Sequence, residues 1–356
     1  MSEIDQATGI RAGEELDADA LKAYFHEHVP ELDGQLEIAQ FPGGASNLTY
    51  QITVDGRDYV LRRPPFGSKV RSAHDMGREY NVLSRLQPVF PYAPRPIVHC
   101  TDESVIGAEF YVMERIRGLI IRKDLPAGMS LSPDEARQLC ESLLDVQAEL
   151  HGIDLDKAGM HDFGKPAGYV ARQVNGWSER YRAAKTGDVP DCEPVMAWLQ
   201  EKMPADKPER AAVIHNDYKF DNVVLDPDNP FRVIGVLDWE MATVGDPVMD
   251  LGCTLGYWVE KDDPEPMQQI RRMPTNLDGM PSRRELVERY QEKTGFQVDD
   301  FDFYHVFGMF RLAVIAQQIY RRYVDGKTQD RRFASLGMVV QVLNGACERV
   351  IDRSAL

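Results

Sequence analysis

The residues best suited to do chemistry lie in one short segment, residues 215–222, which reads H-x-D-x-x-x-x-N. Asp217 and Asn222 come from this segment, and Asp238 follows at the end of the next apolar stretch. Phosphoryl transfer from a nucleotide needs a carboxylate beside the acceptor hydroxyl and oxygen ligands that hold Mg²⁺ on the phosphates. Asp217 fits the first role, and Asn222 and Asp238 fit the second. His215 fits a structural role, bonded to backbone, better than proton transfer.

A small-residue loop lies between two predicted strands and contains Gly43, Gly44, Ser46 and Asn47. Small residues let backbone N–H groups and the Ser46 hydroxyl come close to nucleotide phosphates. The pattern is neither G-x-G-x-x-G nor a Walker A loop, which excludes P-loop chemistry. An ordinary hairpin is the alternative. Together with Asp217, the loop favours phosphate contact.

The N-terminal third is predicted to contain a leading helix, an antiparallel sheet and one further helix. Apolar residues recur at helical spacing over residues 16–28 and 74–86. Strands are predicted over residues 36–41, 50–54, 59–62 and 110–113, with Asp55-Gly56 as a hairpin turn between the second and third. A Pro-rich run separates the second helix from the last strand.

Beyond residue 118 the chain is predicted to be mainly helical. A strong helix start at residues 132–135 leads into a helix over 136–151, and further helices are predicted over 282–293, 303–323 and 333–351. One β-rich insert interrupts them, with strands over 213–215, 223–225 and 232–238. Two of these strands enclose the segment that carries Asp217, and the third ends at Asp238.

Composition indicates a globular protein of two domains or one large two-lobed domain, because the chain has 356 residues and 43% of them are hydrophobic. The net charge of −16 is opposite in sign to that of a nucleic-acid binder, so no nucleic-acid partner is expected. The five cysteines show neither a C-x-x-C pair nor zinc spacing. With no signal-like N-terminus and no long apolar run, we expect a cytoplasmic protein with no membrane partner.

These motifs resemble the aminoglycoside phosphotransferase-like kinases, and most closely the branch that includes kinase domains fused to some acyl-CoA dehydrogenases. The resemblance covers roughly residues 20–350 and rests on residues 43–50, 59–64, 79–80, 149–152 and 215–252. It implies an α+β, bilobal protein-kinase-like fold. Residues 1–114 would form a small N-lobe with an antiparallel sheet, and residues 115–356 a larger, mainly helical C-lobe. Asp246 and Asp250 match a family segment that braces the catalytic loop.

The resemblance also implies roles for individual residues. Asp217 would be the catalytic base, with ATP or GTP as co-substrate and Mg²⁺ as cofactor. Arg62 stands where many kinases have a phosphate-binding lysine, and Glu79 on the following helix is its natural partner. Arginine keeps the positive charge and adds a bidentate fork, but it is not equivalent to lysine. The interlobe hinge, whose backbone would bind the nucleotide base, is matched by Met113, Glu114 and Arg115.

The sequence therefore predicts a small-molecule kinase that phosphorylates a hydroxyl of a metabolite, with hydroxyacids or their coenzyme A esters the first candidates. An antibiotic kinase of the aminoglycoside type is one alternative, and a nucleotide-binding pseudokinase or scaffold is another. The D-F-G letters at residues 162–164 precede Asp217, the reverse of the protein-kinase order, and favour a turn. Residues that could line an acceptor pocket or belong to a helical core are Trp177, Arg180, Tyr181, Tyr320, Arg321 and Arg322. The oligomeric state stays open.

Overall fold

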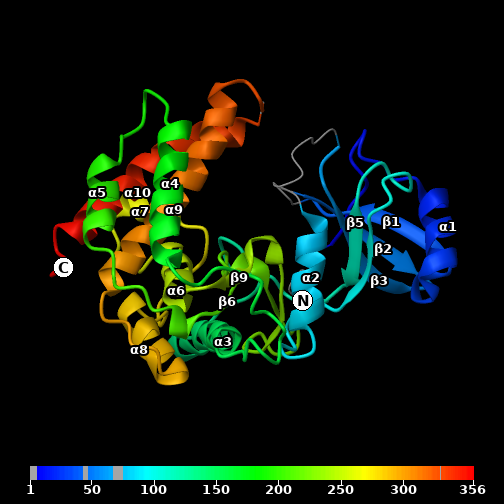
Figure 1. The fold of residues 1–356 in the computed structure, drawn as a ribbon, viewed down its shortest axis with the longest axis horizontal. Helices are drawn as coiled ribbons and strands as arrows, with labels where there is room; N and C mark the ends of the chain where they lie inside the picture. Colours follow the sequence, from blue (N-terminus) through cyan, green and yellow to red (C-terminus); the bar gives the residue numbers. More distant parts are fainter. Residues whose placement is uncertain (1–5, 43–46, 67–74, 329) are drawn as a thin grey trace. The chain divides into compact units, whose positions relative to one another are not determined.

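The computed structural model describes residues 6–42, 47–66, 75–328 and 330–356 (Figure 1). The chain forms two compact units. The first comprises Met1–Ile120 and Val223–Ala242, and the second comprises Ile121–Asn222 and Thr243–Leu356. The first unit thus includes a later stretch of the chain, which carries Asp238. The predicted lobe boundary between residues 114 and 115 stays a prediction.

The first unit is built on a five-stranded antiparallel sheet with the strand order β1-β2-β3-β5-β4. Its strands are β1 (Leu36–Gln40), β2 (Leu48–Val54), β3 (Arg57–Arg63), β4 (Pro96–Cys100) and β5 (Phe110–Glu114). The predicted turn between β2 and β3 is present, and both of its residues have positive φ, 48° at Asp55 and 80° at Gly56. Such a turn matches the twist of the two strands and fixes their register.

Strand β4 was not predicted, because its sequence begins inside a Pro-rich run. Proline cannot donate a ladder hydrogen bond, so it is tolerated at the first residue of a strand or at a sheet edge. Pro96 occupies both positions, since β4 lies at the edge of the sheet and its pairing with β5 shifts register between Pro96 and Val98.

Two helices and a later hairpin complete the first unit. Helix α1 (Ala18–His28) buries Leu21 and Phe25 in the apolar cluster formed by strand residues such as Ile52 and Val112. Burial of a side chain of this size is worth about 1.5–3 kcal/mol. Helix α2 (Met76–Leu86) begins at Asp75, whose side chain accepts a hydrogen bond from the Arg78 amide. The remaining elements are the 3-10 helices η1 (Pro30–Leu32) and η5 (Trp239–Met241) and the paired strands β7 (Val223–Leu225) and β8 (Val233–Val236).

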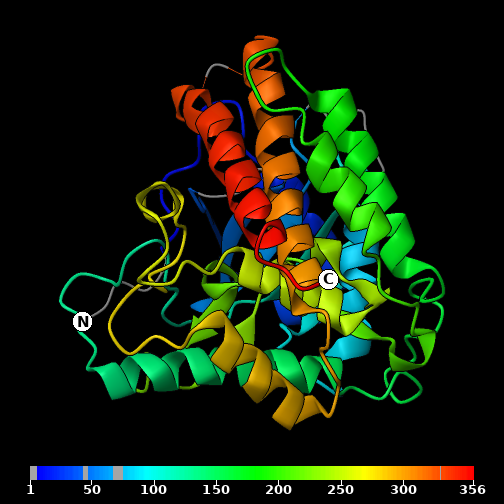
Figure 2. The same cartoon turned by 90° about the vertical axis from the view of Figure 1, so that its left-hand side faces the viewer.

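The second unit is mainly helical. Its helices are α3 (Pro133–His151), α4 (Tyr169–Ala184), α5 (Glu193–Glu201), α6 (Pro247–Gly256), α7 (Glu265–Ile270), α8 (Arg283–Thr294), α9 (Phe301–Val324) and α10 (Leu336–Ile351). Short 3-10 turns occur at η3 (Pro208–Arg210), η4 (Phe220–Asn222) and η6 (Arg331–Ser335). Helix α9 packs against α4, α6 and α10, and Figure 2 shows α4, α9 and α10 running side by side. Capping boxes at Ser132 and Ser282 fix the starts of α3 and α8.

Helices α6 and α9 approach each other across glycines. A Cβ atom on Gly308 would come within 2.0 Å of the Gly252 carbonyl oxygen, and one on Gly256 within 2.8 Å of the Gly308 carbonyl carbon. Neither contact is possible for a larger residue without backbone movement. This close packing fixes the position of Tyr257, which directly follows α6, relative to Arg311 on α9.

The predicted single β-rich insert is wrong in its organisation. The structure contains two separate pairs: β7 with β8 in the first unit, and β6 (Ala212–Ile214) with β9 (Thr243–Gly245) in the second. Strand β9 has three residues, too few for a periodic pattern.

All five cysteines are buried and free. Within the described ranges, we find no helix with both the length and the apolar composition needed to span a bilayer.

Candidate active site

Asp217 lies in a loop of the second unit, between β6 and η4, and three side chains hold its carboxylate. The Tyr257 hydroxyl donates to Oδ1 (2.8 Å), and the Asn222 amide donates to Oδ2 (3.1 Å). The Lys219 ammonium forms an ion pair with the same Oδ2 atom. The carboxylate is therefore fixed in orientation by donors on both oxygens.

Nearby charges keep Asp217 ionised. Burial alone would raise its pKa, but the positive charges of Lys219 and Arg311 outweigh burial and lower the pKa below its ordinary value. Arg311 is itself buried on α9, where its guanidinium lies 5.1 Å from the centre of the Trp177 ring. A negatively charged carboxylate of this kind can accept a hydrogen bond from a hydroxyl at neutral pH.

The loop that carries Asp217 is anchored by the fully buried Asp250 on α6. The Asp250 carboxylate accepts hydrogen bonds from the backbone amides of His215 (3.1 Å) and Asn216 (2.6 Å) and from His151 Nε2 (3.0 Å). Asn216 has a φ of 65°, a left-handed conformation that these bonds stabilise. His215 accepts from the Asp217 amide through Nδ1 (3.2 Å), which fits the structural role predicted for it.

Asn222 has the chemistry of a magnesium ligand. Its amide nitrogen donates to the Asp217 backbone oxygen (2.9 Å) as well as to the Asp217 carboxylate, so the amide oxygen is the atom left to face a cation. In the part of the chain that the structure describes, no cluster of three or more histidine, cysteine or acidic side chains could hold a metal by itself. Mg²⁺ suits such a setting, since it often binds one or two protein oxygens together with substrate phosphates and water.

A second charged cluster lies in the first unit around Arg62. Its guanidinium contacts the carboxylates of Glu79 (2.5 Å), Asp238 (3.1 Å) and Glu240 (3.6 Å). Helix α2 presents Glu79, which also accepts from the Trp239 amide (3.2 Å). Asp238 follows β8 in a left-handed conformation with a φ of 68°. Arg62 binds only its Oδ1 atom, so Oδ2 can serve as a cation ligand.

The environment of this cluster shifts two pKa values. Burial alone would lower the pKa of Arg62, but three carboxylates raise it well above its ordinary value, so Arg62 is charged. Burial raises the pKa of Glu79, and Asp238 adds to the increase, against the opposing effect of Arg62. Three acidic groups thus share one cation.

The structure also describes the neighbours of the predicted glycine loop and hinge. Gly43, Gly44 and Ser46 lie outside the described residues. Asn47, which follows them, is buried and donates to Glu240 (3.0 Å). In the predicted hinge, the Glu114 amide donates to the Arg95 carbonyl (2.8 Å), and the Arg115 guanidinium binds Asp58 (2.8 Å). Met113 is buried at the end of β5 and pairs with Val60.

Comparison with known proteins identifies the family. A family model described as the phosphotransferase enzyme family matches residues 37–286. The chain belongs to this family. Its predicted fold class, α+β and bilobal with a protein-kinase-like architecture, is confirmed.

Two relatives resemble the chain over most of its length. Acyl-CoA dehydrogenase family member 11 of Homo sapiens is 34% identical over 334 residues, which are 92% of this chain and 42% of the human protein. Family member 10 of Mus musculus is 33% identical over 86% of this chain and 28% of its own length. The chain thus spans less than half the length of these relatives. Its similarity to them confirms the predicted relationship to kinase-like domains of acyl-CoA dehydrogenase family proteins.

A solved structure from Ralstonia eutropha JMP134 resembles this phosphotransferase over nearly its whole length. It is described as a candidate aminoglycoside phosphotransferase, is 30% identical, covers 96% of this chain and 100% of its own, and has a TM-score of 0.81. A macrolide 2′-phosphotransferase type I, 20% identical with a TM-score of 0.62, shows the shared fold.

The structure groups the predicted site residues within their units. Asp217 and Asn222 come together in the second unit, and Arg62, Glu79 and Asp238 come together in the first. Lys219 joins the group in the second unit through its ion pair with Asp217.

The predicted D-F-G turn and acceptor residues have structural contacts. Gly164 bridges to Val244 on β9, as a turn packed on a strand would. Tyr181 is fully buried and donates to the Pro190 carbonyl (2.5 Å), and Tyr320 donates to Asp188 (2.5 Å). The helical-core interpretation thus fits Tyr181, whereas the Tyr320 contact lies at the surface.

Tyr257 and Arg311 were missed by sequence reasoning. Both face Asp217 through the packing of α6 against α9, and no local pattern marks either residue.

Proposed function

We propose that this phosphotransferase is a small-molecule kinase that transfers the γ-phosphoryl group of ATP or GTP to a hydroxyl of a metabolite. The observation that carries the proposal is the ionised Asp217 carboxylate, which is held by Tyr257, Lys219 and Asn222. A fixed, charged carboxylate is the group that orients an acceptor hydroxyl and takes its proton. The chemistry would depend mainly on positioning and electrostatic stabilisation.

The nucleotide assignment is supported by neighbours that share the fold. One is described as a spectinomycin phosphotransferase in complex with ADP and spectinomycin, and another as a complex with GDP and kanamycin. Their sequences are 13% and 16% identical to this chain, so the likeness concerns the fold. In this proposal the phosphates are bound by Arg62, with Glu79 as its partner, and by the loop with Gly43, Gly44, Ser46 and Asn47. The base is bound by the backbone at Met113, Glu114 and Arg115.

Magnesium fits the oxygen donors of Asn222 and Asp238. When bound, it would neutralise charge on the phosphates during transfer. The Asn222 amide donates to Asp217 through its nitrogen, so its oxygen is available to a cation. Arg62 binds Oδ1 of Asp238, so Oδ2 is available in the same way. Each would supply one hard oxygen ligand.

An acidic acceptor, such as a hydroxyacid or its coenzyme A ester, suits the charges around the catalytic loop. Burial raises the pKa of Asp221, while the positive charges of Lys219, Arg122 and Arg272 oppose that rise. Arg122 and Arg272 are exposed. Cations beside the loop attract an anionic acceptor and disfavour a polycationic antibiotic. The related proteins are named as acyl-CoA dehydrogenase family members, which also favours a coenzyme A ester as the acceptor.

Substitution of the carboxylate tests the proposal. In Asp217→Ala, Mg²⁺-dependent turnover should fall by several orders of magnitude, while nucleotide affinity measured by calorimetry should stay near that of the wild type. The reason is that the carboxylate acts on the acceptor in the transition state and contributes little to nucleotide binding. Turnover near the wild-type rate would remove Asp217 from this role. Nucleotide binding without turnover on any acceptor would favour the scaffold alternative, for which Arg62 in place of lysine is the argument.

A further inference from the structure

The hydrogen-bond donors around Asp217 leave one lone-pair position of its carboxylate for an acceptor hydroxyl. A carboxylate has about four lone-pair positions, two on each oxygen. Lys219 and Asn222 occupy both positions on Oδ2, and Tyr257 occupies one on Oδ1. The position that remains for an acceptor hydroxyl is therefore on Oδ1, the oxygen that Tyr257 binds.

Tyr257 is suited to hold that oxygen as a permanent donor. Burial and the negative charge of Asp217 raise the pKa of Tyr257 well above its ordinary value, so the phenol keeps its proton. The Lys219 ammonium lies 5.0 Å from the centre of the Tyr257 ring. The Tyr257 ring therefore lies beside the Lys219 ammonium, and the Tyr257 hydroxyl binds the Asp217 carboxylate.

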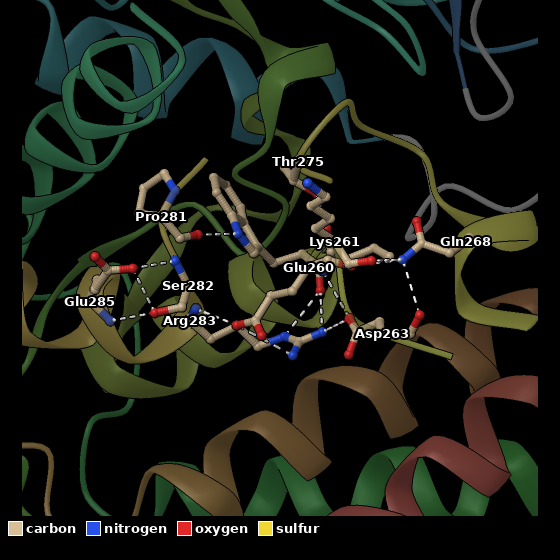
Figure 3. Close-up of polar contacts among 11 residues, drawn as sticks. Glu260, Lys261, Asp263, Gln268, Thr275, Pro281, Ser282, Arg283 and Glu285 are labelled. Carbon is tan, nitrogen blue, oxygen red and sulfur yellow. Dashed lines mark hydrogen bonds and ion pairs between the residues drawn. The ribbon is translucent and has the colours of Figure 1, made fainter. Parts of the chain in front are cut away.

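The segment after Tyr257 is fixed by a dense polar network (Figure 3). The Trp258 carbonyl accepts from Arg283 Nη2 (2.8 Å) and Nε (3.1 Å), and the Trp258 indole donates to the Pro281 carbonyl (3.0 Å). The Val259 amide donates to the Thr275 hydroxyl (3.0 Å). Arg283 also forms an ion pair with Asp263, and its Nη1 atom lies 3.5 Å from Glu260 Oε1.

The same segment also packs on the catalytic loop. The Trp258 ring stacks on Phe220 with 6.4 Å between ring centres, and the Phe220 amide contacts Met273 Sδ (3.4 Å). On the other side of Tyr257, α6 packs on α9 across Gly256 and Gly308. The backbone on both sides of Tyr257 is thus held in place, and from this fixed position its hydroxyl reaches Asp217.

We propose that Tyr257 is a positioning residue for phosphoryl transfer, which fixes the Asp217 carboxylate so that Oδ1 receives the acceptor hydroxyl. The inference rests on the proposed function. In the transfer step, the acceptor oxygen forms a bond to the γ-phosphorus while the bond to the β-γ bridging oxygen breaks, and that electron pair leaves with the nucleoside diphosphate. The acceptor proton passes to Oδ1. Tyr257 keeps its own proton throughout.

The first test uses water as the acceptor, so that no substrate need be known. Mg²⁺-dependent hydrolysis of ATP and of GTP is measured for the wild type, Tyr257→Phe and Asp217→Asn. Tyr257→Phe keeps the ring beside Lys219 and removes only the hydroxyl. Loss of a hydrogen bond to a charged group predicts a kcat lower by about 10- to 100-fold. Nucleotide affinity should be unchanged. The matched control is Tyr181→Phe, because Tyr181 is a buried tyrosine of the same unit whose hydroxyl binds a backbone carbonyl.

The second test measures the carboxylate directly. Protein labelled with ¹³C at the aspartate carboxyl carbons is titrated, and the Asp217 resonance is assigned by its absence in Asp217→Asn. In Tyr257→Phe the Asp217 titration should move to higher pH by about one unit, since a donor to the charged form is lost. In Tyr181→Phe it should not move. If Tyr257→Phe fails to fold, 3-fluorotyrosine at position 257 provides a perturbation that keeps the contact. Its more acidic hydroxyl is a stronger donor, so it should move the titration to lower pH.

The outcomes separate this inference from the proposed function. Loss of hydrolysis in Asp217→Asn, with a wild-type rate and titration in Tyr257→Phe, overturns the role of Tyr257 and leaves the kinase proposal standing. A lower rate in Tyr257→Phe without a shift in the Asp217 titration also overturns it, because a general structural defect explains that result. Undiminished hydrolysis in Asp217→Asn overturns both proposals.

Discussion

Replacement of Arg62 should destabilise the first unit far more than replacement of its closest partner, Glu79. The guanidinium contacts three carboxylates, those of Glu79, Asp238 and Glu240. Arg62→Met keeps the length of the side chain but leaves three neighbouring acids without their shared cation. Glu79→Gln removes one acid and leaves Arg62 with two ionic partners. Its amide oxygen can still accept from the Trp239 amide.

The exposure of each partner sets the expected magnitudes. The side chains of Arg62 and Glu79 are 10% and 1% exposed, whereas those of Asp238 and Glu240 are 34% and 27% exposed. Removing one partner from a buried ion pair costs about 3–5 kcal/mol, and most of that cost should come from the stranded Glu79. For Glu79→Gln we expect about 1–2 kcal/mol, the range for a weakened buried hydrogen bond.

Fluorine NMR during urea unfolding can resolve this difference. Of the four tryptophans, Trp239 lies in the first unit, and Trp177, Trp198 and Trp258 lie in the second. Protein labelled with 5-fluorotryptophan therefore reports on each unit separately. With a urea dependence of about 2 kcal/mol per molar, Arg62→Met should lower the midpoint of the Trp239 transition by roughly 2 M.

Two results would refute this reasoning. Equal midpoint shifts for Arg62→Met and Glu79→Gln would mean that the acids do not depend on a shared cation. An unchanged midpoint in Arg62→Met would mean that the ion pair contributes no net stability. Arg62→Lys should recover part of the loss, because one ammonium cannot reproduce the planar fork of arginine.

Two further predictions concern Asp238 and Asp250. Asp238→Asn should weaken Mg²⁺-dependent nucleotide binding by about 10- to 100-fold, the loss typical when a group that supports a metal is removed; calorimetry that shows unchanged affinity would contradict the ligand assignment. Asp250→Asn should cost about 3–5 kcal/mol, because it weakens a buried network that includes His151. Burial raises the pKa of Asp250, but hydrogen bonding from His151 outweighs it and lowers the pKa. Its contribution to stability is therefore complete above about pH 4 and is lost as the pH falls further. Thermal unfolding of the wild type should depend more steeply on pH below that point than unfolding of Asp250→Asn, and parallel curves would contradict this.

Much of the fold could be predicted from local patterns. The hairpin of β2 and β3 follows from two apolar strands separated by Asp55-Gly56, and the start of α3 follows from a capping box at Ser132. Strand β4 could not be predicted, because Pro96 is compatible with a strand only at its first residue or on an edge, and sequence does not show which strand is the edge. Strand β9 is too short to give a pattern.

Some contacts of the site could likewise be predicted from the local sequence, and others could not. Asp217 and Asn222 are close in sequence, and the spacing between them reflects one loop. The contact between Tyr257 and Asp217 spans 40 residues and depends on helix packing at Gly252, Gly256 and Gly308. Close helix packing of this kind has no signature in a single sequence, since isolated glycines within helices also occur for other reasons. The ion pair of Lys219 with Asp217 likewise depends on the direction in which the loop folds.

A screen with a labelled nucleotide tests whether the protein transfers phosphate to a metabolite. Metabolite pools are incubated with Mg²⁺, ATP or GTP carrying ¹⁸O in the γ-phosphoryl group, and either the wild type or Asp217→Asn, and the products are identified by mass spectrometry. We predict a labelled phosphate ester of a hydroxyacid or of its coenzyme A thioester that forms with the wild type and not with Asp217→Asn. The same labelled product with both proteins, or no labelled product with either nucleotide from any pool, would contradict the account.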